Sequence, residues 1–184
     1  HYDHVALNDA FRRRGAEVVN LETTDLPDDG RWFEGDARRA LMLPLPGCHT
    51  ATDCIVWVEP ERVLFAGDLF GWGLIPLTRP LRKDTYDMLR RIYVRMIDFG
   101  AETVVPGHGP LATTETLRRQ LQYYEWLIEQ AGKALADGRS RQQFLEATPP
   151  PEDMADWWRF AEWKHADSAA KVYSAVERGR LGAG

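Results

Sequence analysis

Cysteine is scarce in this 184-residue sequence, which contains only Cys48 and Cys54. Two cysteines can form only one disulfide bond, which is too few to stabilise a small secreted scaffold, so a disulfide-rich fold is excluded. A pair of reduced, buried thiols is typical of a cytoplasmic protein, and we expect a cytoplasmic localisation.

Long hydrophobic runs and an excess of positive charge are also missing. No apolar run approaches the roughly 20 residues that a transmembrane helix needs, so we expect no membrane partner. With 23 basic and 28 acidic residues the net charge is −5, which offers no general attraction to phosphate backbones. We therefore expect a small-molecule substrate rather than a nucleic acid.

The first 110 residues alternate between short strands and helices. Helical spacing of apolar residues predicts helices over residues 5–14 and 84–100, the second with Asp84 as N-cap. The runs DCIVWV and RVLFAG, joined by EPE, predict a hairpin or two adjacent strands. With the other apolar runs, the expected strands cover residues 17–21, 31–36, 37–45, 53–58, 62–67 and 102–106.

The remainder of the chain is predicted to be all-helical. A helical stripe runs from Leu117 to Leu135, and Ser140 with Gln143 forms a capping box for a shorter helix. A third helix follows PPP, with its apolar face running from Met154 to Val176. The sequence predicts an α+β protein with a mixed domain at residues 1–110 and a helical region at 111–184.

Six candidate metal ligands occur in four short motifs, HYDH, PGCHT, AGDLF and PGHGP. We expect all six in loops or at strand ends, where small neighbours let the backbone curl toward a common point. Imidazole nitrogens and carboxylate oxygens suit zinc, and also iron or manganese. The candidates are His1, Asp3, His4, His49, Asp68 and His108.

Two further residues with ligand chemistry are left out of the site. Cys48 precedes His49, and consecutive side chains of an extended segment point in opposite directions. His165 lies on the apolar stripe of the last helix, where a hydrogen-bonded core histidine is expected.

Taken in order, the four motifs resemble those of the metallo-β-lactamase superfamily of metallohydrolases. HYDH matches the last four positions of the family motif H-x-H-x-D-H. His49 matches the lone histidine after a strand, Asp68 the G-D pair, and His108 the P-G-H-G turn. The resemblance covers about residues 1–110 and implies the second half of an αββα sandwich, followed by the helical segment.

The resemblance also implies two metal ions, with zinc expected and iron or manganese as alternatives. One ion would be held by His1, His49 and a histidine two positions before His1. The other ion would be held by Asp3, His4 and His108, and Asp68 would bridge the two. Because that histidine and several strands precede His1 in the family, we expect this sequence to be the C-terminal portion of a longer polypeptide, with the missing N-terminal half as its partner.

In such a site, two ions about 3.5–4 Å apart share a hydroxide that exists at neutral pH. The implied reaction is attack of this hydroxide on the carbonyl of an ester, thioester, lactone or amide. Asp3 is the expected catalytic residue, because it could orient the hydroxide and protonate the leaving group.

The segment LFGWGLIPLTRPLRK follows Asp68 and is expected to form a wall of the substrate pocket, since its glycines and prolines preclude a regular element. An ordinary surface loop is the alternative. Trp72, Leu74 and Ile75 would present apolar surface, and Arg79 would receive a substrate carboxylate. Tyr2 is either a packing residue or a substrate-facing hydroxyl.

The aromatic-rich segments QLQYYEWLIEQ and WWRFAEWK suggest a lid over the pocket, a homodimer interface or intramolecular packing. Three other functions compete with the hydrolase. The same fold includes iron-dependent oxygenases and redox proteins, and a chain that lacks the upstream histidine could be an inactive metal-site fragment. A copper-binding histidine brace at His1 would leave His49, Asp68 and His108 unexplained.

Overall fold

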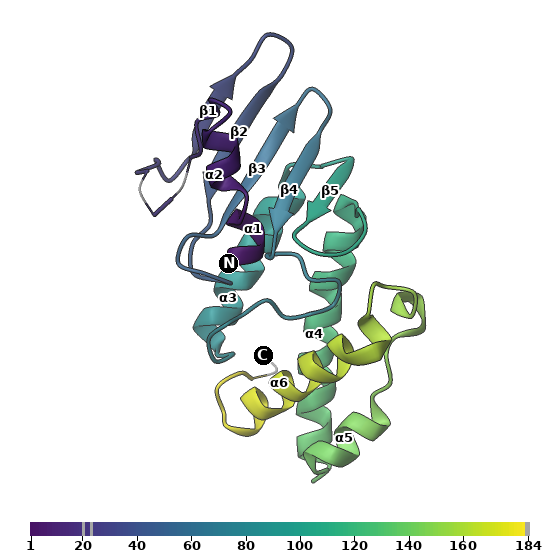
Figure 1. The fold of residues 1–184 in the computed structure, drawn as a ribbon. Coiled ribbons are helices and arrows are strands. Elements are labelled where there is room, and N and C mark those ends of the chain that lie inside the picture. The colour runs from purple at the N-terminus through teal and green to yellow at the C-terminus, as the bar shows by residue number, and fades with distance from the viewer. Residues whose placement is uncertain (20, 23, 183–184) are drawn as a thin grey trace.

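The computed structural model describes residues 1–19, 21–22 and 24–182, and its centre is a five-stranded sheet (Figure 1). Neighbouring strands are antiparallel except β4 and β5, which are parallel. The strands, in spatial order, are β1 (Arg31–Glu34), β2 (Arg39–Pro44), β3 (Cys54–Glu59), β4 (Val63–Gly67) and β5 (Thr103–Pro106). The predicted hairpin of β3 and β4 is confirmed. Because β4 and β5 are parallel, Asp68 and His108, which follow their C-terminal ends, lie at the same end of the sheet.

One face of the sheet is buried. Leu41, Trp57, Leu64 and Val104 are cross-strand neighbours on this face, and none is more than 6% exposed. Helix α3 (Lys83–Asp98) packs behind the sheet and contributes to the same core (Figure 1). The same core includes residues of the C-terminal helices, so the packing is continuous on both sides of residue 110. The division of the chain into two regions at this residue stays a prediction.

The other face carries α1 (Tyr2–Val5) and α2 (Asn8–Arg12) (Figure 1). The single helix expected over residues 5–14 is wrong, because a turn at Ala6 and Leu7 divides the segment. Helix α1 contains Asp3 and His4, so the expectation that all six ligands lie in loops or at strand ends is wrong for these two.

Two further local predictions fail. The described residues of the strand expected over 17–21 pair with no other strand, and Asn20 lies outside the described residues. Helix α3 begins one residue before Asp84, and its N-cap is Arg82, whose backbone N–H donates to the Thr85 hydroxyl at 2.8 Å. That side-chain acceptor satisfies a donor that the first helical turn cannot pair.

The C-terminal part consists mainly of α4 (Thr114–Ala136), α5 (Arg141–Ala147) and α6 (His165–Glu177). The capping box predicted for α5 is confirmed by reciprocal hydrogen bonds between Ser140 and Gln143. The single helix expected from Met154 is wrong. A 3-10 turn, η1 (Glu152–Met154), and a π-helix, η2 (Phe160–Lys164), precede α6, and Arg159, directly before η2, has a left-handed backbone with φ 57°.

Buried polar contacts fasten the segment after Asp68 to the helices. The N–H of Gly73 donates to Gln120 of α4 at 2.8 Å, and the N–H of Ile75 donates to Ser168 of α6 at 3.0 Å. The Tyr93 hydroxyl of α3 donates to the Leu69 carbonyl at 3.0 Å. This segment is therefore held by three helices and is not an ordinary surface loop. Among the described residues, no helix is both long and apolar enough to cross a membrane.

Candidate metal centre

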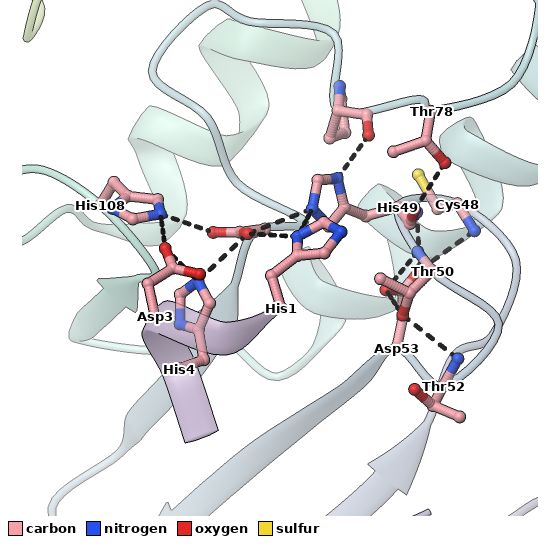
Figure 2. A network of polar contacts seen from close by, with 12 residues as sticks. His1, Asp3, His4, Cys48, His49, Thr50, Thr52, Asp53, Thr78 and His108 are labelled. Atoms are coloured by element: carbon pink, nitrogen blue, oxygen red, sulfur yellow. Dashed lines mark hydrogen bonds and ion pairs between the residues drawn. The ribbon is translucent and has the colours of Figure 1, made fainter. Parts of the chain in front are cut away.

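The six predicted ligands lie together at one end of the sheet, and Figure 2 labels all of them except Asp68. They include four of the five histidines of the chain. Their metal-binding atoms form two groups, within each of which all such atoms lie within 4.8 Å of one another. The first group is His1, His49 and Asp68, and the second is Asp3, His4 and His108.

The first group has the spacing of a metal site. The Nε2 atom of His49 lies 3.1 Å from Nδ1 of His1 and 3.1 Å from Oδ2 of Asp68, and the third separation, His1 to Asp68, is 3.9 Å. Ligand atoms about 2.1 Å from a tetrahedral zinc ion are about 3.4 Å apart. The three residues therefore fit a divalent ion without rearrangement of the backbone.

The second group has similar spacing. Asp3 Oδ2 lies 3.2 Å from Nε2 of His108 and 3.6 Å from Nε2 of His4. Asp68 also reaches this group, since its Oδ2 lies 3.2 Å from His4 and its Oδ1 lies 3.5 Å from His108. The Asp68 carboxylate thus stands between the two groups and can ligate an ion in each.

The ring of His49 is oriented by the pocket-wall segment. Its Nδ1 lies 2.8 Å from the carbonyl oxygen of Pro76. Since a carbonyl only accepts hydrogen bonds, Nδ1 carries the proton and the lone pair of Nε2 faces the first group. An imidazole fixed in this way is typical of a metal ligand.

The backbone of His49 is positioned by Asp53, which the sequence reasoning missed. Asp53 is 8% exposed and accepts hydrogen bonds from the N–H groups of Cys48 (3.1 Å), His49 (2.7 Å) and Thr50 (2.7 Å) (Figure 2). The sequence does contain a signal for this role, since Asp53 follows Thr-Ala-Thr and directly precedes an apolar strand. Aspartate side chains at such positions commonly accept hydrogen bonds from the backbone of a turn.

We expect Asp53→Asn to weaken zinc binding by about 10-fold, because the amide replaces one accepting oxygen with a donor that faces a backbone N–H. A competition titration against a zinc-binding dye measures the affinity. Asp98→Asn, at the exposed end of α3, is the matched control and should bind zinc normally. An Asp53→Asn protein with unchanged affinity would show that this turn does not position His49.

Gly107 allows the second group to form. A β-carbon at this position would lie 2.2 Å from Oδ1 of Asp68 and 2.9 Å from Cε1 of His4, closer than real side chains approach. The Gly107 N–H also donates to the Gly67 carbonyl at 2.9 Å, which ties the ends of β4 and β5 together. Only a residue without a side chain fits between these two ligands.

A cavity of about 340 Å³ adjoins the candidate ligands. Trp158, Trp163 and Lys164, from the C-terminal part, form one of its sides. Its lining residues are His1, Asp3, His49, Asp68, Phe70, Gly71, Leu74, Pro76, His108, Trp158, Trp163 and Lys164. Residues of the aromatic segment WWRFAEWK thus line the cavity, whereas a lid over the pocket and a homodimer through the C-terminal helices stay predictions.

The predicted pocket residues are dispersed. Leu74 lines this cavity, but Trp72 is 8% exposed and packs between Phe70 and Trp157. Ile75 and Arg79 line a different cavity beside α6. Tyr2 is 81% exposed and lines neither cavity.

Cys48 and His165 have the surroundings of structural residues. Burial raises the pKa of the Cys48 thiol to about 12, which keeps it protonated. The ring nitrogens of His165 pair with the Tyr123 hydroxyl at 2.9 Å and the Thr148 carbonyl at 2.7 Å, and burial lowers its pKa. Neither residue belongs to the two ligand groups.

Known proteins are similar to this chain in sequence and in fold. The family model of the metallo-beta-lactamase superfamily matches residues 19–108, which include His49, Asp68 and His108. The chain is 28% identical over 102 residues to the Beta-lactamase-like protein 2 homolog of Caenorhabditis elegans, a match that covers 55% of this chain and 32% of that protein. The match therefore spans only about a third of this curated relative.

Two solved structures are similar in fold. A metallo-beta-lactamase from Pontibacter korlensis has a TM-score of 0.51 and 23% identity, covering 67% of this chain and 64% of that one. A metallo-beta-lactamase family protein from Thermus thermophilus has a TM-score of 0.51 and 22% identity, covering 96% and 60%. Residues 19–108 thus match the metallo-beta-lactamase superfamily, and the α+β fold with a C-terminal helical segment is similar to the folds of these two structures.

Proposed function

We propose that this chain carries the metal centre of a hydrolase in which hydroxide attacks the carbonyl carbon of an ester, thioester, lactone or amide and the bond from this carbon to the leaving oxygen, sulfur or nitrogen breaks. The observation that supports the proposal most strongly is the position of Asp68, whose two carboxylate oxygens approach ligands of both groups. The match to the superfamily supports a metal-dependent hydrolytic function in general.

In the proposed reaction, different residues would bind the metal ions, transfer a proton and line the cavity. The two groups described above would each hold one ion, with Asp68 between them, and zinc is the metal that this set of donors favours. Bound ions would supply Lewis acidity and lower the pKa of water toward neutrality. Asp3 faces the cavity near His108, where its carboxylate can hold a proton for the leaving group. Phe70, Leu74 and Pro76 contribute apolar surface to the lining of the same cavity.

Removal of metal is expected to abolish hydrolysis. The chain, loaded with zinc, is assayed against matched ester, thioester, lactone and amide substrates, then treated with a chelator and reloaded with zinc, iron or manganese. We expect activity on at least one substrate class, loss of this activity on chelation, and recovery with one of the metals.

Hydrolysis that survives complete removal of metal would contradict the proposal. Absence of hydrolysis, together with one bound iron per chain and oxygen consumption, would assign the centre to oxygenase chemistry instead. Metal content is measured on the same samples by elemental analysis.

A further inference from the structure

A buried cation lies in the wall of the metal cavity. Lys164 is only 2% exposed and lines the cavity shared with the candidate ligands. Its Nζ donates to the carbonyl oxygen of Gly71 at 2.9 Å and stands 3.9 Å above the ring of Trp158. An ammonium group has three N–H donors, and no carboxylate in the described part of the chain forms an ion pair with it. Lys164 thus retains hydrogen-bonding capacity at the wall of the cavity.

An unusual backbone places Lys164 there. Arg159 has φ 57°, and the following π-helix η2 ends at Lys164. Gly73 permits this arrangement, because a β-carbon there would lie 2.3 Å from a ring atom of Phe160. A π-helical turn is rare and frequently marks a functional site. Without the irregular turn, the segment would continue the regular helix that its apolar spacing predicts.

The surroundings disfavour an ammonium without a counter-charge. Burial lowers the pKa of Lys164 to about 8, repulsion from Arg159 acts in the same direction, and Glu162 opposes them. Much of the cavity wall is apolar, since its lining includes Phe70, Leu74, Pro76 and two tryptophans, whose ring centroids lie 3.9 Å (Trp158) and 5.9 Å (Trp163) from Nζ of Lys164. A buried ammonium in such a wall is stabilised when an anion pairs with it.

We propose that Lys164 forms an anion subsite that receives a carboxylate carried on an apolar substrate. This inference rests on the proposed function, because it assigns a substrate class to the same cavity. The two tryptophans contact the apolar body of the substrate, while its carboxylate accepts hydrogen bonds from Nζ, a charge-assisted interaction. The reactive carbonyl then lies on the side of the candidate ligands.

The first test is direct binding. Isothermal titration calorimetry compares naphthaleneacetate with its uncharged amide, both on the metal-loaded and on the metal-free chain. In the metal-free chain the carboxylate cannot bind to a metal ion, so any remaining preference for the carboxylate comes from the protein itself. We expect the carboxylate to bind about 10- to 100-fold more tightly than the amide, and Lys164→Met to abolish this preference without changing the affinity for the amide.

Two control variants accompany the test. Lys164→Arg keeps the positive charge and should retain most of the preference. Lys133→Met, at an exposed position of α4 where the lysine pairs with Glu129, should behave as the unmodified chain. Thermal melting identifies a variant that fails to fold, and in that case Lys164→Arg and Lys164→Gln supply the comparison.

The outcomes separate this proposal from the proposed function. A carboxylate preference that persists in Lys164→Met would overturn the subsite. A Lys164-dependent preference in a chain that hydrolyses nothing would refute the hydrolase and leave the subsite standing. If hydrolysis occurs, KM for carboxylate-bearing esters should rise in Lys164→Met while KM for neutral esters stays the same. An equal change for both would contradict the proposal.

Discussion

Replacement of Asp68 by asparagine is expected to reduce hydrolysis more than about 100-fold and to weaken metal binding in both groups. The physical reason is that the two carboxylate oxygens approach different ligands, Oδ2 near His4 and His49 and Oδ1 near His108. An amide presents only one accepting oxygen and carries no charge, so it cannot ligate both ions. Loss of a residue that only supports a ligand typically lowers metal affinity or activity by about 10- to 100-fold. Loss of a ligand shared by the two groups should lower them further.

Metal stoichiometry and kinetics check this result together. Elemental analysis after dialysis should show fewer than half of the ions held by the unmodified chain. The exposed Asp98→Asn variant controls for the change of charge. If Asp68→Asn lost one ion and held the other with unchanged affinity, the bridging position would be contradicted.

Gly107→Ala is expected to lower zinc affinity and activity by about 10- to 100-fold, although it adds only a methyl group outside the ligand set. The added β-carbon would lie 2.2 Å from Oδ1 of Asp68, so either the carboxylate or the turn before His108 must move. A displacement of about 1 Å in a catalytic site can cost about 100-fold in rate.

Gly182→Ala provides the matched control, because a β-carbon there meets nothing within 4 Å. Zinc affinity is measured by dye competition, and circular dichroism verifies that both variants are folded. A folded Gly107→Ala protein with normal affinity would show that the space between Asp68 and His4 is less restricted than the structure indicates.

The five strands of the sheet were predictable because their signals are local. Val, Ile, Trp and Phe in DCIVWV and RVLFAG favour extended chain, and EPE marks a turn, so the pairing of β3 with β4 followed directly. The helical tail was predictable only in part. The apolar stripe from Met154 to Val176 fits one continuous helix. In the structure, Phe160 packs against Gly73, Arg159 has a left-handed backbone, and a π-helix follows it. Tertiary contacts override such periodicity.

The sequence by itself determined the resemblance to the superfamily and the identity and order of the candidate ligands, since these depend on residue types at characteristic spacings. Only the tertiary structure decided how they combine, because Asp68 meets His4 and His49 through contacts between residues far apart in the chain. The supporting role of Asp53, the clearance at Gly107 and the burial of Lys164 also depend on such packing. Local patterns cannot predict them, because each depends on what the fold brings next to the residue.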